Sequence, residues 1–437
     1  MNQAHDVADA DPYQWLEDVT GQAALDWARD RNAEALGELS HGARFEELRT
    51  QIRQVLDSDD RIPYPRRRGA YLYNFWQDET HPRGLWRRTT LEEYRQDQPG
   101  WEVLLDVDAL AEQEGENWVW QGATVLRPGG YRLALVQLSR GGADASVVRE
   151  FDVAGHRFVE GGFSLAEAKS DAGWIDADRI YVGTDFGPGS LTTSGYPRVV
   201  KEWHRGTALP EAAVVYEGKP DDVSVGAFHD PTEGFERDFV VRSPDFFSSE
   251  WYLRTGGGLV QLAVPEDAIV DVHREWLLVR TRSEWATGGA TYPAGVLLAT
   301  RFDAFLAGER ELTVLFEPDA HTSLSYDAWT RHHLILSTLH DVRSQLAVLT
   351  PDGGQWRRTA LAGVPEFAQT DIVGTDPDDS DELWLASSSF TQPDTLRYGH
   401  IGDGLQALKQ APAFFDAAGM STPVSYTHLT LPTTPYV

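Results

Sequence analysis

Short apolar segments separated by turn residues dominate the sequence from about residue 62 to about residue 405. Segments such as 71–76, 132–138 and 276–280 are rich in leucine, valine and aromatic residues. Turn residues recur roughly every ten positions between them, a spacing typical of β-strands, and no long stretch with helical periodicity interrupts the series. The span is too long for a single β-sandwich, which takes about 100 residues, so few all-β architectures can accommodate it.

Radial repetition is the usual architecture for so many short strands, because a β-propeller packs four-stranded blades around a central channel. A blade takes roughly 40–50 residues, so a span of about 350 residues predicts about seven blades. Strand 333–339 can pair with strand 345–349 as one hairpin of such a blade. Repeats are not obvious, since residues 176–182 and 381–386 share only an acidic turn before an apolar strand. We predict a mainly β fold, with a seven-bladed β-propeller over residues 61–410.

The segment that precedes the strands has helical patterning. Asp11 followed by Pro12 is typical of a helix start. Apolar positions follow helical spacing in part over residues 24–39 and again over residues 45–56. The sequence therefore predicts a short N-terminal helical segment over residues 1–60.

The chain carries a large excess of acidic residues, 68 against 38 basic residues, which gives a formal net charge of −30. Such a field repels a phosphate backbone, so we expect no nucleic-acid partner. The excess favours a solubilising acidic surface, and the alternative is that it steers cationic peptides toward the protein. The chain has no cysteine, which excludes disulfides, thiolate metal sites and a cysteine nucleophile.

Targeting and membrane signals are not seen in the sequence. Residues 1–10 have neither a basic region nor an apolar region of the kind found in signal peptides. No apolar run approaches the ~20 residues that a membrane helix needs. We therefore expect a soluble, cytoplasmic protein with no membrane partner.

Serine nucleophiles of α/β-hydrolases sit in a G-x-S-x-G turn between a strand and a helix. The nearest match is Gly162-Phe163-Ser164-Leu165-Ala166, which lacks the second glycine and is followed by no helical pattern. Ser190 and Ser194 have no glycine two residues before them. These serines fit turns and strand surfaces, and the sequence predicts no catalytic residue.

Metal-binding patterns are equally weak. There is no H-E-x-x-H motif. His332, His333 and His340 could form a cluster, but adjacent residues of a strand point to opposite faces. The acidic run at residues 376–382 has Asp381 where a calcium loop needs glycine, so a solvated turn is the better interpretation. We predict no metal site.

Two further site types remain weak candidates. Gly256-Gly257-Gly258 fits a hairpin turn and not a phosphate loop, because no helix follows it, so no cofactor is predicted. A propeller glycosidase would place paired carboxylates at the central channel. With 68 acidic residues in the chain, chance pairs are expected, and this signal does not discriminate.

Four stretches resemble a known family. Residues 11–18, 141–152, 162–198 and 387–396 resemble the N-terminal helices and propeller domain of the prolyl oligopeptidase family of serine peptidases, and the resemblance covers roughly residues 11–420. It implies a propeller that sits over the active site of an α/β-hydrolase domain and admits short peptides while excluding folded proteins. It also implies serine-peptidase cleavage of oligopeptides, often after proline. None of the matching stretches holds a catalytic residue that could be carried over.

The end of the sequence departs from this resemblance. Residues 411–424 fit the start of a linker to an α/β-hydrolase domain that does not follow. Residues 425–437 contain neither an acidic residue nor arginine, and we expect them to be a non-native tail. The sequence thus predicts the substrate-gating part of a peptidase, with short peptides and that hydrolase domain as partners and no activity of its own. The alternative is a stand-alone propeller that acts as a binding module.

Overall fold

The computed structural model describes residues 11–420 except 128, 342, 366–367 and 414–415. The chain divides into two compact units, Met1–Asp59 and Asp60–Val437. The expected tail at residues 425–437 and part of the expected linker lie outside the described residues.

The first unit is helical, as predicted. It contains η1 (Gln14–Glu17), α1 (Gln22–Leu39) and α2 (Ala43–Leu56). Trp15 of η1 lies edge-on to Trp27 of α1, with ring centroids 6.4 Å apart, which fixes the short helix against the long one. Along α2 the apolar positions recur every three or four residues, so they form one face, and Leu48, Ile52 and Leu56 on that face are exposed.

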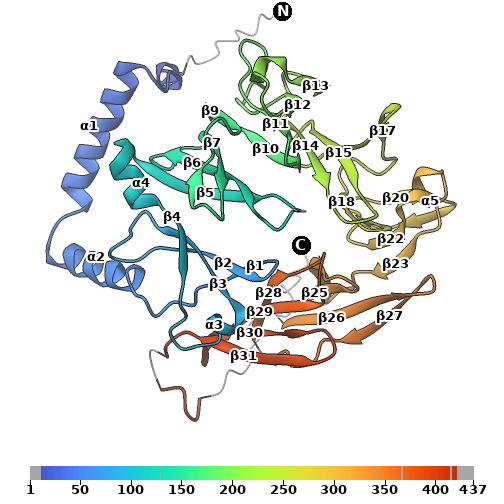
Figure 1. Ribbon diagram of the computed structural model, residues 1–437. Coiled ribbons are helices and arrows are strands. Elements are labelled where there is room, and N and C mark those ends of the chain that lie inside the picture. Colours follow the sequence, from blue (N-terminus) through green and yellow to red (C-terminus); the bar gives the residue numbers. More distant parts are fainter. Residues whose placement is uncertain (1–10, 128, 342, 366–367, 414–415, 421–437) are drawn as a thin grey trace, which may run out of the picture. The chain divides into compact units, whose positions relative to one another are not determined.

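The second unit consists mainly of seven antiparallel sheets, six with four strands and one with five, which Figure 1 shows arranged around a common centre. We number these sheets blades 1 to 7 in chain order. The prediction of a mainly β fold with seven blades is confirmed.

The strands follow one another within each blade. Blades 1 to 3 contain β1 (Arg66–Arg68), β2 (Tyr71–Trp76), β3 (Leu85–Thr90) and β4 (Glu102–Asp106); β5 (Trp118–Val125), β6 (Leu133–Arg140), β7 (Ser146–Asp152) and β8 (Arg157–Phe158); and β10 (Asp171–Asp176), β11 (Arg179–Gly183), β12 (Val199–His204) and β13 (Ala213–Glu217). Blade 2 has a fifth strand, β9 (Ser164–Ala168), which pairs with β7.

The remaining blades have the same order. Blades 4 to 7 contain β14 (Ser224–Asp230), β15 (Arg237–Ser243), β16 (Glu250–Thr255) and β17 (Gly258–Gln261); β18 (Ile269–His273), β19 (Trp276–Arg280), β22 (Leu297–Arg301) and β23 (Thr313–Phe316); β24 (Thr322–Trp329), β25 (Leu334–His340), β26 (Arg343–Asp352) and β27 (Gln355–Ala360); and β28 (Gln369–Thr375), β29 (Glu382–Ser389), β30 (Gln392–His400) and β31 (Gly404–Gln410). A separate hairpin of β20 (Trp285–Thr287) and β21 (Ala290–Tyr292) lies within the blade 5 segment. Short helices connect strands: α3 (Leu91–Tyr94), α4 (Val107–Glu114), η2 (Leu209–Glu211) and α5 (Phe302–Leu306).

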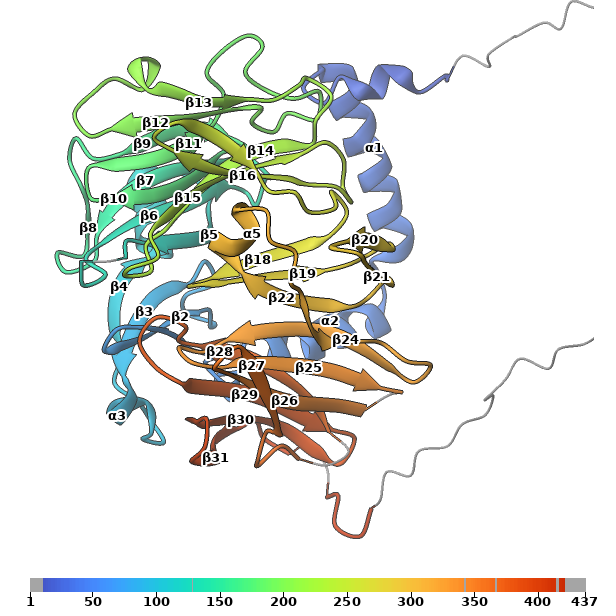
Figure 2. The ribbon, with the colours of Figure 1, turned by 90° about the vertical axis from the view of Figure 1, so that its right-hand side faces the viewer.

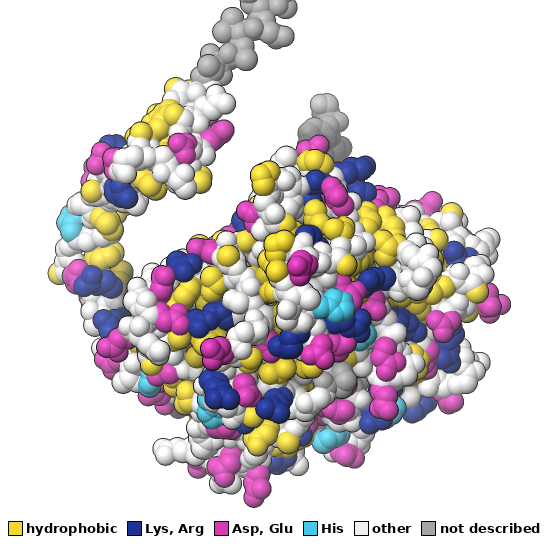
Figure 3. All heavy atoms as spheres, turned by 45° about the horizontal axis from the view of Figure 1, so that its top comes forward, with side chains coloured by type: hydrophobic (Ala, Val, Ile, Leu, Met, Phe, Trp, Pro, Cys, Tyr) yellow, Lys and Arg dark blue, Asp and Glu magenta, His cyan; other side chains and the backbone are white. Residues whose placement is uncertain are grey.

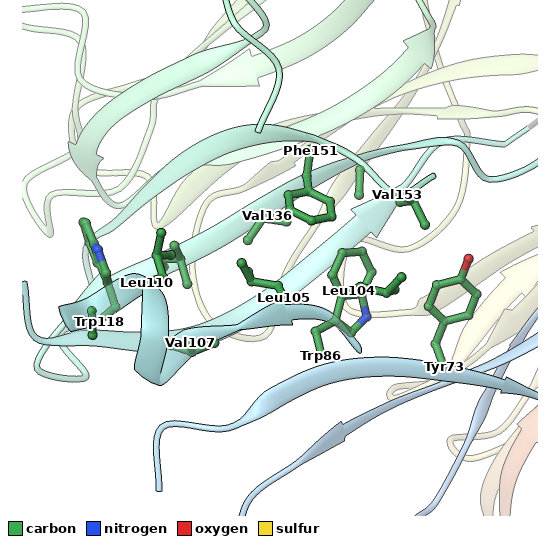
Figure 4. Close-up of a cluster of buried hydrophobic side chains, with 13 residues drawn as sticks. Tyr73, Trp86, Leu104, Leu105, Val107, Leu110, Trp118, Val136, Phe151 and Val153 are labelled. Carbon is green, nitrogen blue, oxygen red and sulfur yellow. The ribbon is translucent and has the colours of Figure 1, made fainter. Parts of the chain in front are cut away.

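The hydrophobic core is divided among the interfaces between neighbouring blades. Each side of a blade presents alternate side chains of its strands, and every pair of neighbours in the ring encloses its own buried cluster. Figure 4 shows the cluster between blades 1 and 2, where Trp86 lies against Phe151 with ring centroids 5.6 Å apart. Blade 7 closes on blade 1 through Tyr94 and Trp384, whose rings meet edge-on at 5.8 Å. The ring is therefore closed by side-chain packing.

Candidate functional site

The first strand of each blade lines the centre of the ring. These strands contact one another from blade to blade, as β10 does with β14, β24 with β28 and β28 with β1. A propeller with this arrangement surrounds a central channel. The seven innermost strands are therefore the walls of the candidate site.

The channel has two distinct ends. Because consecutive strands of a blade are antiparallel, the turns from first to second strand lie at one end, and the connections between blades lie at the other. Figure 2 shows strands running across the view between these ends. We call them the turn face and the linker face. The chain enters β1 and leaves β31 at the linker face, so Arg61 and Ala411 both lie there, and both line one cavity.

That cavity lies between blades 1 and 2 and has a volume of about 890 Å³. Its walls combine aromatic rings with amide and guanidinium groups. Phe75 stacks on Trp120 at 5.2 Å, and Gln121, Gln137 and Arg68 supply polar atoms. Cavities with apolar walls and a few convergent polar groups are typical ligand sites. This one could hold a ligand through aromatic and polar contacts.

Arg68 gives the cavity an unusual charge. Burial among the blades lowers the pKa of its guanidinium, and the neighbouring Arg127 and Arg66 lower it further. Arg68 forms no ion pair within the described part of the chain, and its Nη1 donates to the Arg67 carbonyl at 2.9 Å. The nearby Tyr131 and Asp376 partly offset the lowering of the Arg68 pKa, so Arg68 is a half-buried cation with a carboxylate in its surroundings. A guanidinium group in this position can still donate hydrogen bonds to a carboxylate of a ligand.

The walls of blades 3, 5 and 6 carry the opposite charge. Burial raises the pKa of Asp171 on β10, and its carboxylate lies 2.9 Å from where a Cβ at Gly226 would stand, so a side chain there would displace it. Burial also raises the pKa of Asp271, which accepts a hydrogen bond from Trp329 Nε1 at 2.9 Å. Asp327 on β24 has a pKa raised to about 6, through burial first and the nearby Asp271 second. Carboxyl groups with raised pKa values thus occur on the innermost strands of blades 3, 5 and 6.

The three serines considered as nucleophiles lie in structural positions. Ser164 is exposed at the start of β9, after a turn in which Gly162 packs against the buried Glu150: a Cβ there would stand 2.7 Å from the carboxylate. Ser190 is buried and donates to the Gly187 carbonyl at 2.7 Å. Ser194 is exposed and its carbonyl accepts from a lysine. In the described part of the chain, none of the three hydroxyls has a histidine partner.

His332 and His333 lie beside Asp381 of the acidic run, whereas His340 lies at the other end of β25. His332 Nδ1 lies 2.8 Å from Asp381 Oδ2, and His333 Nδ1 lies 2.8 Å from Thr350 Oγ1. His340 Nδ1 lies 2.9 Å from Thr322 Oγ1. Among the residues that the structure describes, no group of three or more His, Asp or Glu side chains could hold a metal ion.

A search of the described residues for membrane-spanning helices finds none that is sufficiently long and apolar.

Sequence reasoning missed the cavity and the charged walls. Arg68 and Gln121 lie on different blades, and Asp171 and Asp327 are separated by two blades and more than a hundred positions. A strand pattern tells which residues share a face, but it does not tell which strand faces which channel wall. No signal in the sequence marks these residues.

Comparison with known proteins gives the family. The model described as "Prolyl oligopeptidase, N-terminal beta-propeller domain" matches residues 1–411. An uncharacterized peptidase of Sinorhizobium fredii is 36% identical over 94% of this chain and 58% of its own length. An uncharacterized peptidase of Rickettsia prowazekii is 26% identical over 92% of this chain and 58% of its own length. The chain therefore spans 58% of the curated relatives it matches.

Solved structures agree on the fold. A post-proline cleaving enzyme from Rickettsia typhi has a TM-score of 0.86 at 25% identity, over 92% of this chain and 61% of that one. Oligopeptidase B from Leishmania major has a TM-score of 0.70 at 16% identity, over 93% of this chain and 57% of that one. The described residues here form helices and propeller blades and contain no α/β-hydrolase sheet. This chain belongs to the prolyl oligopeptidase family and corresponds to its N-terminal β-propeller domain.

Proposed function

We propose that this propeller is the substrate-gating part of a serine peptidase that cleaves short peptides, and that an α/β-hydrolase domain supplies the catalytic residues. The observation that carries the proposal is the match of the whole described propeller to a family whose relatives here are peptidases of greater length. On this proposal residues 1–60 are a helical segment, residues 61–410 the propeller, and residues 411–424 the start of a linker to the hydrolase domain. Localisation in the cytoplasm stays part of the proposal, and cell fractionation would test it.

Two features of the propeller and one of the helical unit support this arrangement. Arg61 and Ala411 lie at the same end of the channel, so a domain connected after residue 411 would stand beside the linker face. The cavity of about 890 Å³ opens there with aromatic and guanidinium walls. A peptide bound in this cavity would lie between the propeller and such a domain. The apolar face of α2 that includes Leu48, Ile52 and Leu56 is exposed, and exposed apolar faces of this kind often mark interaction surfaces.

A chimera tests the proposal. The hydrolase part of the Sinorhizobium fredii relative would be joined after residue 411, and the chain alone and the hydrolase part alone would serve as controls. We expect the chimera to cleave a short proline-containing fluorogenic peptide, with inhibition by a serine-directed reagent, while the propeller alone does not. The chimera should also leave folded proteins intact. Turnover by the propeller alone would contradict the proposal, as would a chimera that folds but cleaves no peptide.

A further inference from the structure

The acidic turn at residues 376–381 does not project freely into solvent. It connects β28 to β29 in blade 7, so it belongs to the turn face. Asp378 at its tip forms a salt bridge with Arg127, which follows β5 in blade 2. The backbone carbonyl of Asp378 accepts a hydrogen bond from Arg274 Nη2 at 3.2 Å, and Arg274 follows β18 in blade 5. One residue thus connects three blades.

These three blades are not neighbours in the ring. Blade 1 stands between blades 7 and 2, and blade 6 stands between blades 5 and 7. Groups from non-adjacent blades can meet only where they reach over the channel. The contacts of Asp378 with Arg127 and Arg274 therefore cross the mouth of the channel at the turn face.

The base of the turn is anchored independently of its tip. The backbone nitrogen of Arg331 in blade 6 donates to the Ser380 carbonyl at 3.0 Å, and its Nη1 donates to the Asp379 carbonyl at 3.2 Å. Asp381 accepts from Thr330 Oγ1 and from the His332 nitrogen, each at 2.8 Å. With its base fixed on the neighbouring blade, the turn can lose its contacts at the tip without leaving blade 6.

The contacts at the tip are weak enough to be released. The side chains of Arg127 and Asp378 are 38% and 23% exposed, and ion pairs open to solvent contribute about 0–1 kcal/mol and weaken as salt rises. The Arg274 contact is a single hydrogen bond to a carbonyl. The contacts at the tip therefore contribute little net free energy, and the contact with Arg127 depends on charge.

We propose that residues 376–381 form a lid over the turn-face mouth of the channel, latched by Arg127 and Arg274, and that a peptide passes this mouth only when the latch is released. This regulation rests on the proposed gating function, because it assigns the gate at this mouth to one turn and two arginines. The molecule that passes the mouth is a peptide. Either a higher ionic strength or a competing charge on the peptide itself releases the latch.

A single thiol inside the channel tests the lid. The chain has no cysteine, and a Cβ added at Gly173 on the innermost strand of blade 3 meets no atom within 4 Å. In the Gly173→Cys chain we would compare the labelling rates of a small maleimide and of a maleimide carried by a short peptide. Labelling of an Asp403→Cys chain, in which the thiol lies on an exposed turn, corrects for the reagents themselves.

We expect a latch variant to change the labelling rate of the peptide reagent but not that of the small reagent. Asp378→Arg should raise the peptide–maleimide rate at position 173 roughly two- to fivefold, the factor that an exposed ion pair of up to about 1 kcal/mol supplies, and leave the small maleimide unchanged. Arg127→Asp combined with Asp378→Arg should restore the slow rate by reversing the pair. Arg132→Asp, a change at an exposed side chain directly before β6, is the matched control and should have no effect.

A change in salt concentration tests the lid without any substitution in the latch, so the result does not depend on whether the latch variants fold. In the chain changed only at Gly173, raising the salt from about 20 mM to about 500 mM should speed the peptide–maleimide reaction, because screening weakens the latch. Equal rates in low and high salt, or a double variant that stays fast, would overturn the lid. The assay contains no hydrolase domain, so the linker face is open in every variant, and peptide that enters there gives a common background rate. Only the change in the peptide–maleimide rate between variants therefore reports on the lid. Failure of this assay and failure of the peptidase proposal remain distinguishable, because labelling needs no peptidase activity.

Discussion

At the scale of single residues, the channel retains ionisable groups at an energetic cost. Asp327 is the clearest case: burial and the neighbouring Asp271 raise its pKa to about 6 from an ordinary 3.8, while Arg280 opposes the shift. A carboxyl group with a raised pKa in the folded state disfavours folding once the unfolded chain has ionised. The cost is absent at low pH, grows as pH rises from about 4 and is complete above pH 6.

We expect Asp327→Asn to stabilise the protein at pH 8 by about 1–3 kcal/mol, because the amide carries no charge to bury. The gain should shrink as the pH is lowered toward about 4.5. Urea unfolding at several pH values measures it. Asp403→Asn, an exposed carboxylate on the turn before β31, is the control and should change little. A gain that is independent of pH would show that burial of the charge is not the cause.

At the scale of elements, the blade is the unit of packing, and the junction of blade 7 with blade 1 closes the ring. Trp384 on β29 is 1% exposed and lies 5.8 Å edge-on from Tyr94 of blade 1. Its Nε1 also donates to Glu382 at 2.9 Å, and Glu382 is itself buried and lies 3.4 Å from Arg67. One indole therefore supports both the apolar and the charged contacts of this junction.

Trp384→Leu should lower the free energy of unfolding by about 3–5 kcal/mol, since it creates a cavity and removes a donor from a buried carboxylate. Hydrogen exchange should speed up in blades 1 and 7 before it changes in blade 4, because the blades on either side of the junction lose a neighbour. Phe390→Ala, 89% exposed on the same blade, is the matched control. Uniformly faster exchange around the ring would contradict a local junction.

At the scale of the whole molecule, the net charge of −30 dominates encounters with charged ligands. Figure 3 shows Asp and Glu side chains spread over the visible face and not gathered into one patch. A field of this sign attracts cations from a distance and repels anions, and its range falls as salt rises.

Two peptides of equal length, one rich in lysine and one rich in glutamate, test this field. The lysine peptide should associate about tenfold faster at low salt, and the difference should largely vanish at about 500 mM salt. Stopped-flow fluorescence with labelled peptides measures both rates. A preference for the glutamate peptide at low salt would mean that the local arginines of blade 1, including Arg68, outweigh the global charge.

Much of the architecture could be predicted from the sequence. Alternation of apolar residues over 71–76 and 132–138 predicts strands because the two faces of a strand have different surroundings, and both segments lie within or over strands β2 and β6. The number of blades follows from the length of such a span divided by the length of a blade. These properties depend on neighbours in the chain, which the sequence contains.

The candidate site could not be predicted in this way. The acidic turn at residues 376–381 reads as a solvated loop, and its contact with Arg127 joins positions 251 residues apart. The absence of an α/β-hydrolase elbow around Ser164 is visible in the sequence, whereas the reason for Gly162, a close approach to the Glu150 carboxylate, is not.

The sequence by itself determined the strands, the number of blades, the helical N-terminal segment and the overall charge, because each is a sum over local patterns. Only the tertiary structure decided which carboxylates and arginines face the channel and which turn crosses its mouth. Closure of the ring brings residues of non-adjacent blades to hydrogen-bonding distance across the channel. No local pattern carries that information, since the distance between two blades is set by the whole ring.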